Sequence, residues 1–496
     1  MTGNFIIDDT LRHFDARAEL EAMRHEDRWY GPAFHLKLLL MAVSIALSAC
    51  GGGGGGGGGT GSAADTTAAT TSTGDATTGD ATTVRVGSNT QFPAVTGNGG
   101  GSVGAATVAQ PAVTWSGPLT ISRGGTYTGN WESTSASTPA VHITTAEAVI
   151  IENANIRGRG DLITGHNVNL TVRDSHGWAL NPNAAGKAPG RFLRLSNVRN
   201  AVVENNYLEG TAGMRIGYFV GDAAAGQTIK IRYNRARNID GRCSDGAGGF
   251  TTQQNCEEGL AQFAQLTDLK GVPNVEIAWN EVVNLPEQSR PEDIISIYKA
   301  NGTAASPIRI HNNYVEGAYP VNVTDSGPGT FSGGGIMLGD GDGSTLDEIP
   351  GFVDAYDNHV IATTNHGINI SAGHDLHFYR NRIIISGRLA DGTYIPSTYA
   401  GVGRVVDYYG QRSRGLYFNN WAQDNKWAGV RRGDDGKYYR RDESDLDREL
   451  SGCATGMCTG NQSLEPGNLD LRALEAAEYG VWKGKVQQAG VRVGPQ

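Results

Sequence analysis

The stretch 274–285 has the sequence NVEIAWNEVVNL, and its pattern decides the fold. Apolar Val275 and Ile277 flank a polar residue, Asn280 follows, and a second short apolar segment comes after the asparagine. Period-two alternation places apolar side chains on one face of a short strand. Asparagine is typical of a bend, because it tolerates a left-handed backbone. The stretch therefore predicts two short strands joined by a tight corner.

The same pattern recurs at irregular intervals along the chain. Copies are AVVENNYLEG (201–210), TIKIRYNRARNI (228–239), PIRIHNNYVEGA (307–318), FVDAYDNHVIAT (352–363) and DLHFYRNRIIIS (375–386), with looser copies near Asn153, Asp174 and Asn420. The corner asparagines of the clear copies are Asn206, Asn234, Asn280, Asn313, Asn358 and Asn381. Spacings of 23 to 46 residues indicate a constant rung with insertions of variable length.

A single such strand cannot bury its apolar face, but stacked copies can, at about 4.8 Å per rung. We therefore predict an all-β fold, a single-stranded right-handed parallel β-helix of about nine rungs, spanning residues 111–427 and carrying long lateral loops. The six asparagines are expected in one column at the same bend, where asparagine tolerates a left-handed backbone and its amide can bond to the asparagine of the next rung. Residues 428–496 are predicted to be a loop-rich C-terminal cap, in which a short helix within Leu469–Gln488 covers the far end.

The first hundred residues do not belong to this solenoid. Leu38–Ala49 (LLLMAVSIALSA) is apolar and too short to span a bilayer, which is typical of a signal peptide. It ends in LSAC, which resembles the bacterial lipobox and implies a lipidated Cys50 in the outer membrane. The alternative is a secretory signal with an incidental cysteine. Residues 1–49 are thus a signal region, within which 1–34 are too polar and suggest a later translation start. Residues 50–110 are a flexible Gly/Thr/Ala tether.

Charge and cysteine content limit the partners. Forty-one basic and fifty-one acidic residues give a net charge of −10, and no basic run marks a nucleic-acid surface. We expect a monomer that touches the membrane only through its lipid.

Four cysteines besides Cys50 indicate two short-range disulfides, as is common in exported proteins. They are Cys243, Cys256, Cys453 and Cys458. Zinc at the last pair is disfavoured, because no histidine lies nearby in the sequence.

Two segments and the rungs carry a family resemblance. The run SRPEDIISIYKANGTAASPIRIHNN (289–313), followed by SGGGIMLGDGDG (332–343), resembles bacterial right-handed β-helix proteins of the pectate-lyase-like superfamily. The resemblance covers about residues 112–425. It implies the fold and a carbohydrate ligand, but not one activity, because the superfamily holds lyases, hydrolases, epimerases and adhesins.

Chemistry is expected in the three longest insertions, 240–272, 285–306 and 317–350. They follow successive rungs, so we expect them side by side, forming a groove on one lateral face. Arg290, Asp293, Lys299, Asp340 and Asp342 are predicted to converge there.

This residue set suits β-elimination on an acidic polysaccharide. Lys299 or Arg290 serves as the catalytic base, and Asp293, Asp340 and Asp342 hold a Ca²⁺ that neutralises the uronate. Lys299 is displaced by one residue from the family's arrangement, which reverses the face of the strand. Structural alternatives are a salt bridge between Asp293 and Lys299, and a simple turn at Asp340–Asp342.

Arg242, Tyr298 and Tyr319 are the candidates for contact with the sugar chain. The leading function is thus a polysaccharide lyase. The alternatives are a non-catalytic, glycan-binding or adhesive β-helix on the cell surface or in the periplasm, and a glycoside hydrolase with two carboxyls at the scissile bond.

Overall fold

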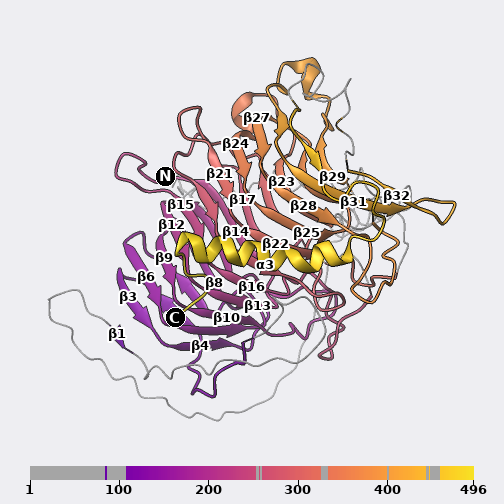
Figure 1. Ribbon diagram of the computed structural model, residues 1–496. Helices are drawn as coiled ribbons and strands as arrows, with labels where there is room; N and C mark the ends of the chain where they lie inside the picture. Colours follow the sequence, from indigo (N-terminus) through magenta and orange to yellow (C-terminus); the bar gives the residue numbers. More distant parts are fainter. Residues whose placement is uncertain are drawn as a thin grey trace, which may run out of the picture. The chain divides into compact units, whose positions relative to one another are not determined.

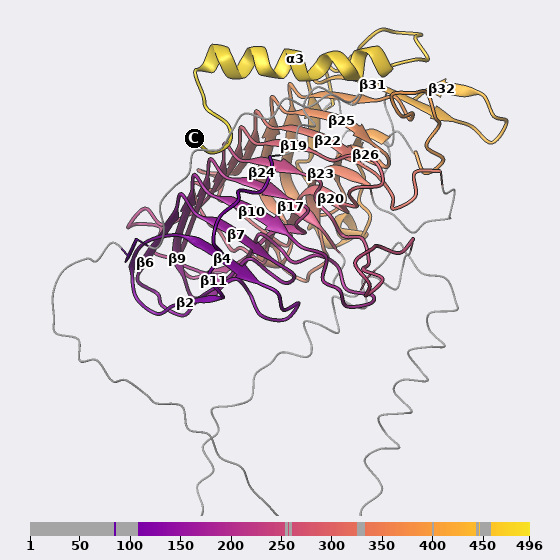
Figure 2. The same cartoon turned by 90° about the horizontal axis from the view of Figure 1, so that it is seen from below.

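The computed structural model describes residues 108–252, 256, 260–324, 333–398, 401–442, 446 and 458–496, together with the backbone of Val84–Arg85. All lie in the unit Ala81–Gln496. The chain winds into a parallel β-helix whose three sheets are drawn in Figures 1 and 2. The fold expected from the rungs is therefore confirmed at the level of a parallel solenoid with one C-terminal helix.

Each sheet takes every third strand of the chain. Sheet 1 has eleven strands: β1 (Val84–Arg85), β3 (Gly125–Thr128), β6 (Ala148–Glu152), β9 (Asn169–Arg173), β12 (Asn200–Glu204), β15 (Ile229–Arg232), β18 (Glu276–Ala278), β21 (Ile308–His311), β24 (Gly351–Tyr356), β27 (His374–Tyr379) and β30 (Trp421–Gln423). Sheet 2 has twelve: β4 (Asn130–Ser133), β7 (Asn155–Gly158), β10 (His176–Ala179), β13 (Tyr207–Glu209), β16 (Arg235–Arg237), β19 (Glu281–Val283), β22 (Tyr314–Ala318), β25 (His359–Thr363), β28 (Arg382–Ile385), β31 (Lys426–Arg432), β32 (Tyr438–Arg440) and β33 (Gln462–Ser463).

Sheet 3 has ten strands: β2 (Leu119–Ile121), β5 (Val141–Ile143), β8 (Ile163–His166), β11 (Leu193–Val198), β14 (Gly213–Phe219), β17 (Gln262–Thr267), β20 (Asp293–Tyr298), β23 (Gly334–Asp340), β26 (His366–Ile370) and β29 (Gly401–Val405). A coil consists of one strand from sheets 3, 1 and 2 in turn. The ten strands of sheet 3 therefore give ten coils, one more than the nine rungs predicted. Two 3-10 helices (η1, Leu346–Glu348; η2, Gln411–Arg414) lie in the loops.

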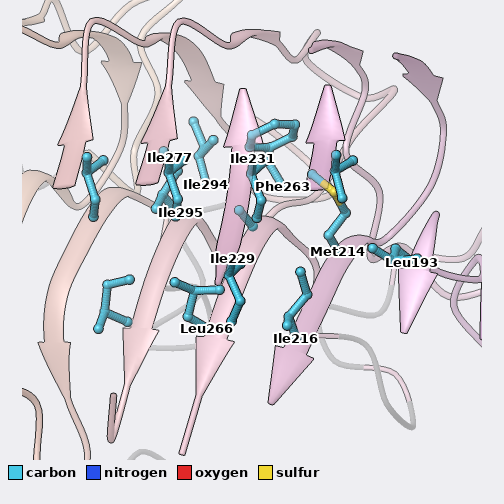
Figure 3. Close-up of a cluster of buried hydrophobic side chains, with 14 of the residues drawn as sticks. Leu193, Met214, Ile216, Ile229, Ile231, Phe263, Leu266, Ile277, Ile294 and Ile295 are labelled. Carbon is cyan, nitrogen blue, oxygen red and sulfur yellow. The ribbon is translucent and has the colours of Figure 1, made fainter. Parts of the chain in front are cut away.

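The core is one continuous column of aliphatic side chains inside the coils. Figure 3 shows part of it, with Leu193, Ile216, Leu266 and Ile295 on four successive strands of sheet 3 and Ile231 on sheet 1. Each of these side chains is no more than 2% exposed. At about 25 cal/mol per Å² of apolar area, burial of this column is the main stabilising term of the solenoid.

Asparagines stack at the corner between sheets 1 and 2 to form the asparagine ladder. In each step the backbone N–H and the Nδ2 of one asparagine donate to the Oδ1 of the next, over 2.9–3.1 Å. The ladder contains Asn206, Asn234, Asn280, Asn313, Asn358, Asn381, Asn425 and Asn461. Asn420 stands apart from it, because its Oδ1 accepts from Leu376 N at a different bend.

The left-handed residue at this corner is not the ladder asparagine itself. It is the residue before it, for example Tyr233 (φ 60°), Trp279 (φ 56°) and Arg380 (φ 55°). Asparagine tolerates a left-handed backbone, but at this corner the residue before it adopts that backbone. The N–H and the Nδ2 of each ladder asparagine donate to the same acceptor, and the chain turns at the residue before it.

The predicted insertions also differ from expectation. Each contains a strand of sheet 3, β17, β20 or β23, with a loop on either side. The helix α3 (Arg472–Ala489) does not cover the end of the solenoid. It lies along the outward face of sheet 2, where Trp482 packs on Val283 and Ile361, as Figure 2 shows. The apolar face of α3 packs there because Ile361 points outward from sheet 2.

Candidate functional site

The five residues predicted to converge lie at two ends of neighbouring strands. Arg290 and Asp293 stand at the start of β20, whereas Lys299 directly follows its last residue. Asp340 ends β23 beside Tyr298. Six extended residues separate the Cα atoms of Asp293 and Lys299 by up to about 20 Å. The five residues therefore do not form the expected single site. Asp293 and Lys299 are separated along the length of β20, and Asp340 lies at the Lys299 end of the neighbouring strand.

The start of β20 holds a buried polar cluster. Asp293 Oδ1 lies 3.3 Å from His366 Nε2, which is within ion-pair distance but without the angles of a hydrogen bond. Glu292 Oε2 accepts from Gln262 Nε2 at 2.6 Å. Burial, with the adjacent Asp293 carboxyl adding to it, raises the pKa of Glu292 to about 8, against the opposing charge of Arg290. The Arg290 side chain is 2% exposed, so it is not accessible to a polymer as a base.

The other end of these strands is organised around Asp340 and Asp342. Tyr409 OH donates to Asp340 Oδ1 at 2.5 Å, and Arg414 donates to Asp342 Oδ1 at the same distance. Partial burial opposes ionisation of Asp342, but the bonds from Arg414 and Gln411 outweigh it and lower its pKa. Lys299 adopts the left-handed conformation (φ 50°).

No calcium cluster forms from these carboxylates. Asp293 faces His366, Asp340 holds Tyr409, and Asp342 holds Arg414. Among the residues that the structure describes, no three His, Cys, Asp or Glu side chains are placed to hold a metal ion.

The three predicted sugar-contacting residues have different surroundings. Arg242 is bonded to Asp240 at 2.8 Å and lies 4.2 Å from the ring centre of Phe250. Tyr319 is 7% exposed and packs against other apolar side chains, so its ring face is not open to a sugar. Tyr298 is partly exposed beside Lys299, whose Nζ lies 5.7 Å from the ring centre.

A groove opens elsewhere, on the outward face of sheet 3 near the N-terminal coils. It has a volume of about 560 Å³. Its floor includes Thr120, His142, Thr164 and Arg194, which are neighbours in register on β2, β5, β8 and β11. Loops 136–139 and 187–191 line its sides.

The same outward row continues beyond the groove. Arg194 is followed in register by Arg215 on β14 and Gln265 on β17. Arg215 is exposed and forms no ion pair within the described part of the chain. Polar side chains thus follow each other at the spacing of the coils, about 4.8 Å.

Among the described residues that line this groove, cations outnumber acids. Lys187, Arg191 and Arg194 line it, and Asp161 is the acid among the lining residues. Arg194 Nε donates to Asp161 Oδ2 at 2.6 Å. Arg191 is fixed by bonds to the carbonyls of Ala212 (3.1 Å) and Leu260 (2.5 Å). Burial, and then the nearby Arg194, lower the pKa of Arg191 to about 9, so it remains a cation at pH 7.

Sequence analysis missed this row, although a signal for it exists. Each floor residue stands between two inward residues, as in Val141-His142-Ile143, Leu193-Arg194-Leu195 and Met214-Arg215-Ile216. The asparagines at the bends of β8 and β11, Asn167 and Asn197, lie outside the asparagine ladder, so the ladder pattern does not reveal these strands.

Two of the predicted cysteines are bonded to each other. Cys243 and Cys256 form a disulfide that closes a loop of sheet 3, with Cα atoms 5.2 Å apart. Cys458 is also disulfide-bonded. Cys50 and Cys453 lie outside the described residues. In the part of the chain described, no helix has the length and apolar character required to cross a membrane.

Comparison with known proteins gives no relative. No protein-family model matches the chain, and neither a curated protein nor a solved structure is similar to it.

Proposed function

We propose that this protein is an exported β-helix that binds an acidic polysaccharide along the outward face of sheet 3. The observation that carries the proposal is the 560 Å³ groove, where Lys187 and Arg194 line the surface, Arg215 continues the same outward row, and Asp161 is the one acid among the described lining residues. An open groove with a regular floor suits an extended polymer. Arginine binds carboxylates in a bidentate manner, which suits uronate groups.

Binding takes precedence over β-elimination in this proposal. Lys299, the proposed base, is separated from Asp293 by the length of β20. Arg290, the other candidate, is buried. A base has to lie within hydrogen-bond reach of the proton that it removes. The lyase remains an alternative function, and calcium is no part of the proposal.

Arg215 gives the sharpest test, because it is exposed and its loss breaks no internal ion pair. Binding of polygalacturonate and alginate by the wild type is compared with binding of a neutral glucan. Arg215→Gln should weaken binding of the acidic polymers about tenfold or more, as expected for a lost bond to a charged group of about 1.5–3 kcal/mol. Arg173→Gln, on the exposed face of sheet 1, is the control; it removes a cation away from the groove, together with an ion pair to Glu152 at 2.6 Å.

Two results would contradict the proposal. One is equal binding of neutral and acidic polymers by the wild type. The other is equal affinity of Arg215→Gln and Arg173→Gln for the acidic polymers. Products that absorb in the ultraviolet would instead establish the lyase, and reducing ends without that absorbance would establish a hydrolase.

Export and a lipid at Cys50 form a second part of the proposal. They are supported by the apolar segment Leu38–Ala49, by the LSAC sequence and by the Cys243–Cys256 disulfide, which suits an oxidising compartment. Mass spectrometry of the mature N-terminus tests this: we expect a diacylated Cys50, and an unmodified Cys50 would contradict it.

A further inference from the structure

The described histidines differ in whether an acid lies beside them. Five have a carboxylate oxygen at 2.6–3.3 Å from a ring nitrogen: His311, His359, His366, His374 and His377. Another, His176, is buried, and burial lowers its pKa to about 4. The remaining two, His142 and His166, are exposed and have neutral partners. Both point outward from sheet 3, on the adjacent strands β5 and β8.

His142 stands in the floor of the groove on sheet 3. Its in-register neighbours are Thr120 on β2 and Thr164 on β8, and Arg194 follows Thr164 on β11. Two coils separate His142 from Arg194, a distance of about 10 Å. An extended polymer that lies in the groove and reaches Arg194 therefore also passes His142. His166 shares this face but is not among the described residues that line the groove.

The imidazole of His142 is held by one hydrogen bond. Nδ1 lies 2.9 Å from Thr164 Oγ1, and no other described residue bonds to the ring. Nε2 is therefore available to a ligand. Protonation makes both nitrogens donors, and imidazole is the side chain that changes charge between about pH 5 and 8.

The charged groups around His142 do not offset an added proton. Lys187 lines the groove from the wall loop, and Arg194 lines it from β11. Asp161 already accepts from Arg194 Nε at 2.6 Å and from the backbone N–H of Arg191 at 2.7 Å. Among the described lining residues, loop 136–139 and the neighbouring strands β2 and β8 contribute uncharged side chains. The counter-charge for an imidazolium therefore has to come from a ligand.

We propose that His142 makes binding of the acidic polysaccharide depend on pH, because the protonated ring donates to a carboxylate of the polymer. This inference rests on the proposed function of the groove and adds a regulating residue to it. Linkage fixes the sign: a bound carboxylate stabilises the protonated ring, so binding tightens as the pH falls. The polymer stays ionised over this range, since ordinary carboxyl groups titrate near about pH 4. The groove thus holds the polymer in mildly acidic surroundings and releases it more readily in neutral ones.

The test compares the affinity of the full-length chain for polygalacturonate at about pH 5.5 and about pH 8, at constant ionic strength. We expect the wild type to bind about fivefold more tightly at the lower pH, as suits one charge-assisted hydrogen bond in an exposed groove. His142→Gln should lose this difference and bind at both pH values as the wild type does at the higher one. His142→Lys keeps a charge at both values and should bind tightly at both.

His166→Gln is the matched control, because it removes an exposed histidine from the same face outside the groove. It should retain the pH dependence of the wild type. Arg215→Gln should weaken binding at both pH values and also retain that dependence.

Two results would overturn the inference while leaving the proposed function intact. One is an unchanged pH dependence in His142→Gln, which would place the titrating group elsewhere. The other is binding by the wild type that is equally tight at both pH values. Absence of binding at either pH would instead overturn the proposed function of the groove, and this inference with it.

Discussion

Asp293 and His366 face each other across Gly334, with Oδ1 and Nε2 3.3 Å apart on either side of a strand that has no side chain between them. A Cβ on Gly334 would lie 1.9 Å from Asp293 Oδ1 and 2.3 Å from His366 Nε2. The contact between two side chains that are two coils apart therefore depends on a glycine in the intervening coil.

Gly334→Ala should destabilise the protein strongly, because the added methyl displaces a buried acid or a buried histidine. Overpacking of this kind costs about 1–3 kcal/mol or more. The midpoint of chemical denaturation measures it. Gly480→Ala in α3 is the control: nothing lies within 4 Å of its Cβ position, so the helix should gain about 0.5–1 kcal/mol. Destabilisation of similar size in both variants would contradict the packing argument.

Asn313→Ala interrupts the asparagine ladder. It leaves the N–H and Nδ2 of Asn280 and the carbonyl of Ile277 without their partner. Each unpaired buried group costs about 1–3 kcal/mol, so the unfolding free energy should fall by about 3 kcal/mol. Asn322→Ala, which removes two local bonds from Thr324 on an exposed turn, should have little effect. Equal stability of the two variants would argue against a stabilising ladder.

Lys299→Gly should be more stable than Lys299→Ala by about 1 kcal/mol, because Lys299 is left-handed (φ 50°) and only glycine adopts this backbone without strain. Thermal unfolding of the two variants measures the difference. If Lys299→Ala is the more stable, strain at this position is negligible. Neither variant should change binding of an acidic polymer in the sheet 3 groove.

Glu478 and Glu475 on α3 should respond differently to substitution by glutamine. Glu478 is bound to Arg382 at 2.5 Å and to His359 at 2.6 Å. Removing the charge from a buried pair costs about 3–5 kcal/mol, so Glu478→Gln should be strongly destabilising. Glu475→Gln should be nearly neutral at pH 7, because the carboxyl is already protonated and the amide replaces it. Comparison of unfolding free energies decides this.

The pH dependence of stability should also change in Glu475→Gln. Burial raises the pKa of Glu475 from its ordinary value of 4.5 to about 8 in the folded state. The folded chain then holds a proton that the unfolded chain releases. This group therefore adds stability that is complete below about pH 4.5 and is lost as the pH rises toward 8. The variant should remove a slope of up to about 1.4 kcal/mol per pH unit. An unchanged pH profile would contradict the assignment.

Much of the solenoid follows from local pattern alone. Alternation around Asn234 or Asn313 predicts strands and a corner, and repetition predicts stacking. The sequence did not distinguish two asparagines that both fit the pattern. Asn420 resembles a ladder residue, but Asn425 is the asparagine that accepts from Asn381. The sequence alone could not place the left-handed residue of the corner for the same reason, since both residues of the corner are compatible with a bend.

The candidate site was harder to predict, because it depends on which residues of neighbouring strands lie side by side. Asp293 and Lys299 lie close together in sequence but at opposite ends of β20. His142, Arg194 and Arg215 lie far apart in sequence but in one row across four successive coils, with Thr164 between His142 and Arg194. Register between strands brings the second group together, and register is a property of the stacked coils.

The asparagine ladder has a direction, because each asparagine donates to the one that follows it in the chain. Synthesis releases the N-terminal coils first, so a growing solenoid always ends in an asparagine whose two donors await the next coil. The described series ends at Asn461. Contacts that run backwards come last: Trp482 reaches the Asn312 carbonyl, and Arg492 reaches Asp174. We therefore expect the coils to assemble from the N-terminus onward, and the C-terminal segment to bind coils that were completed before it.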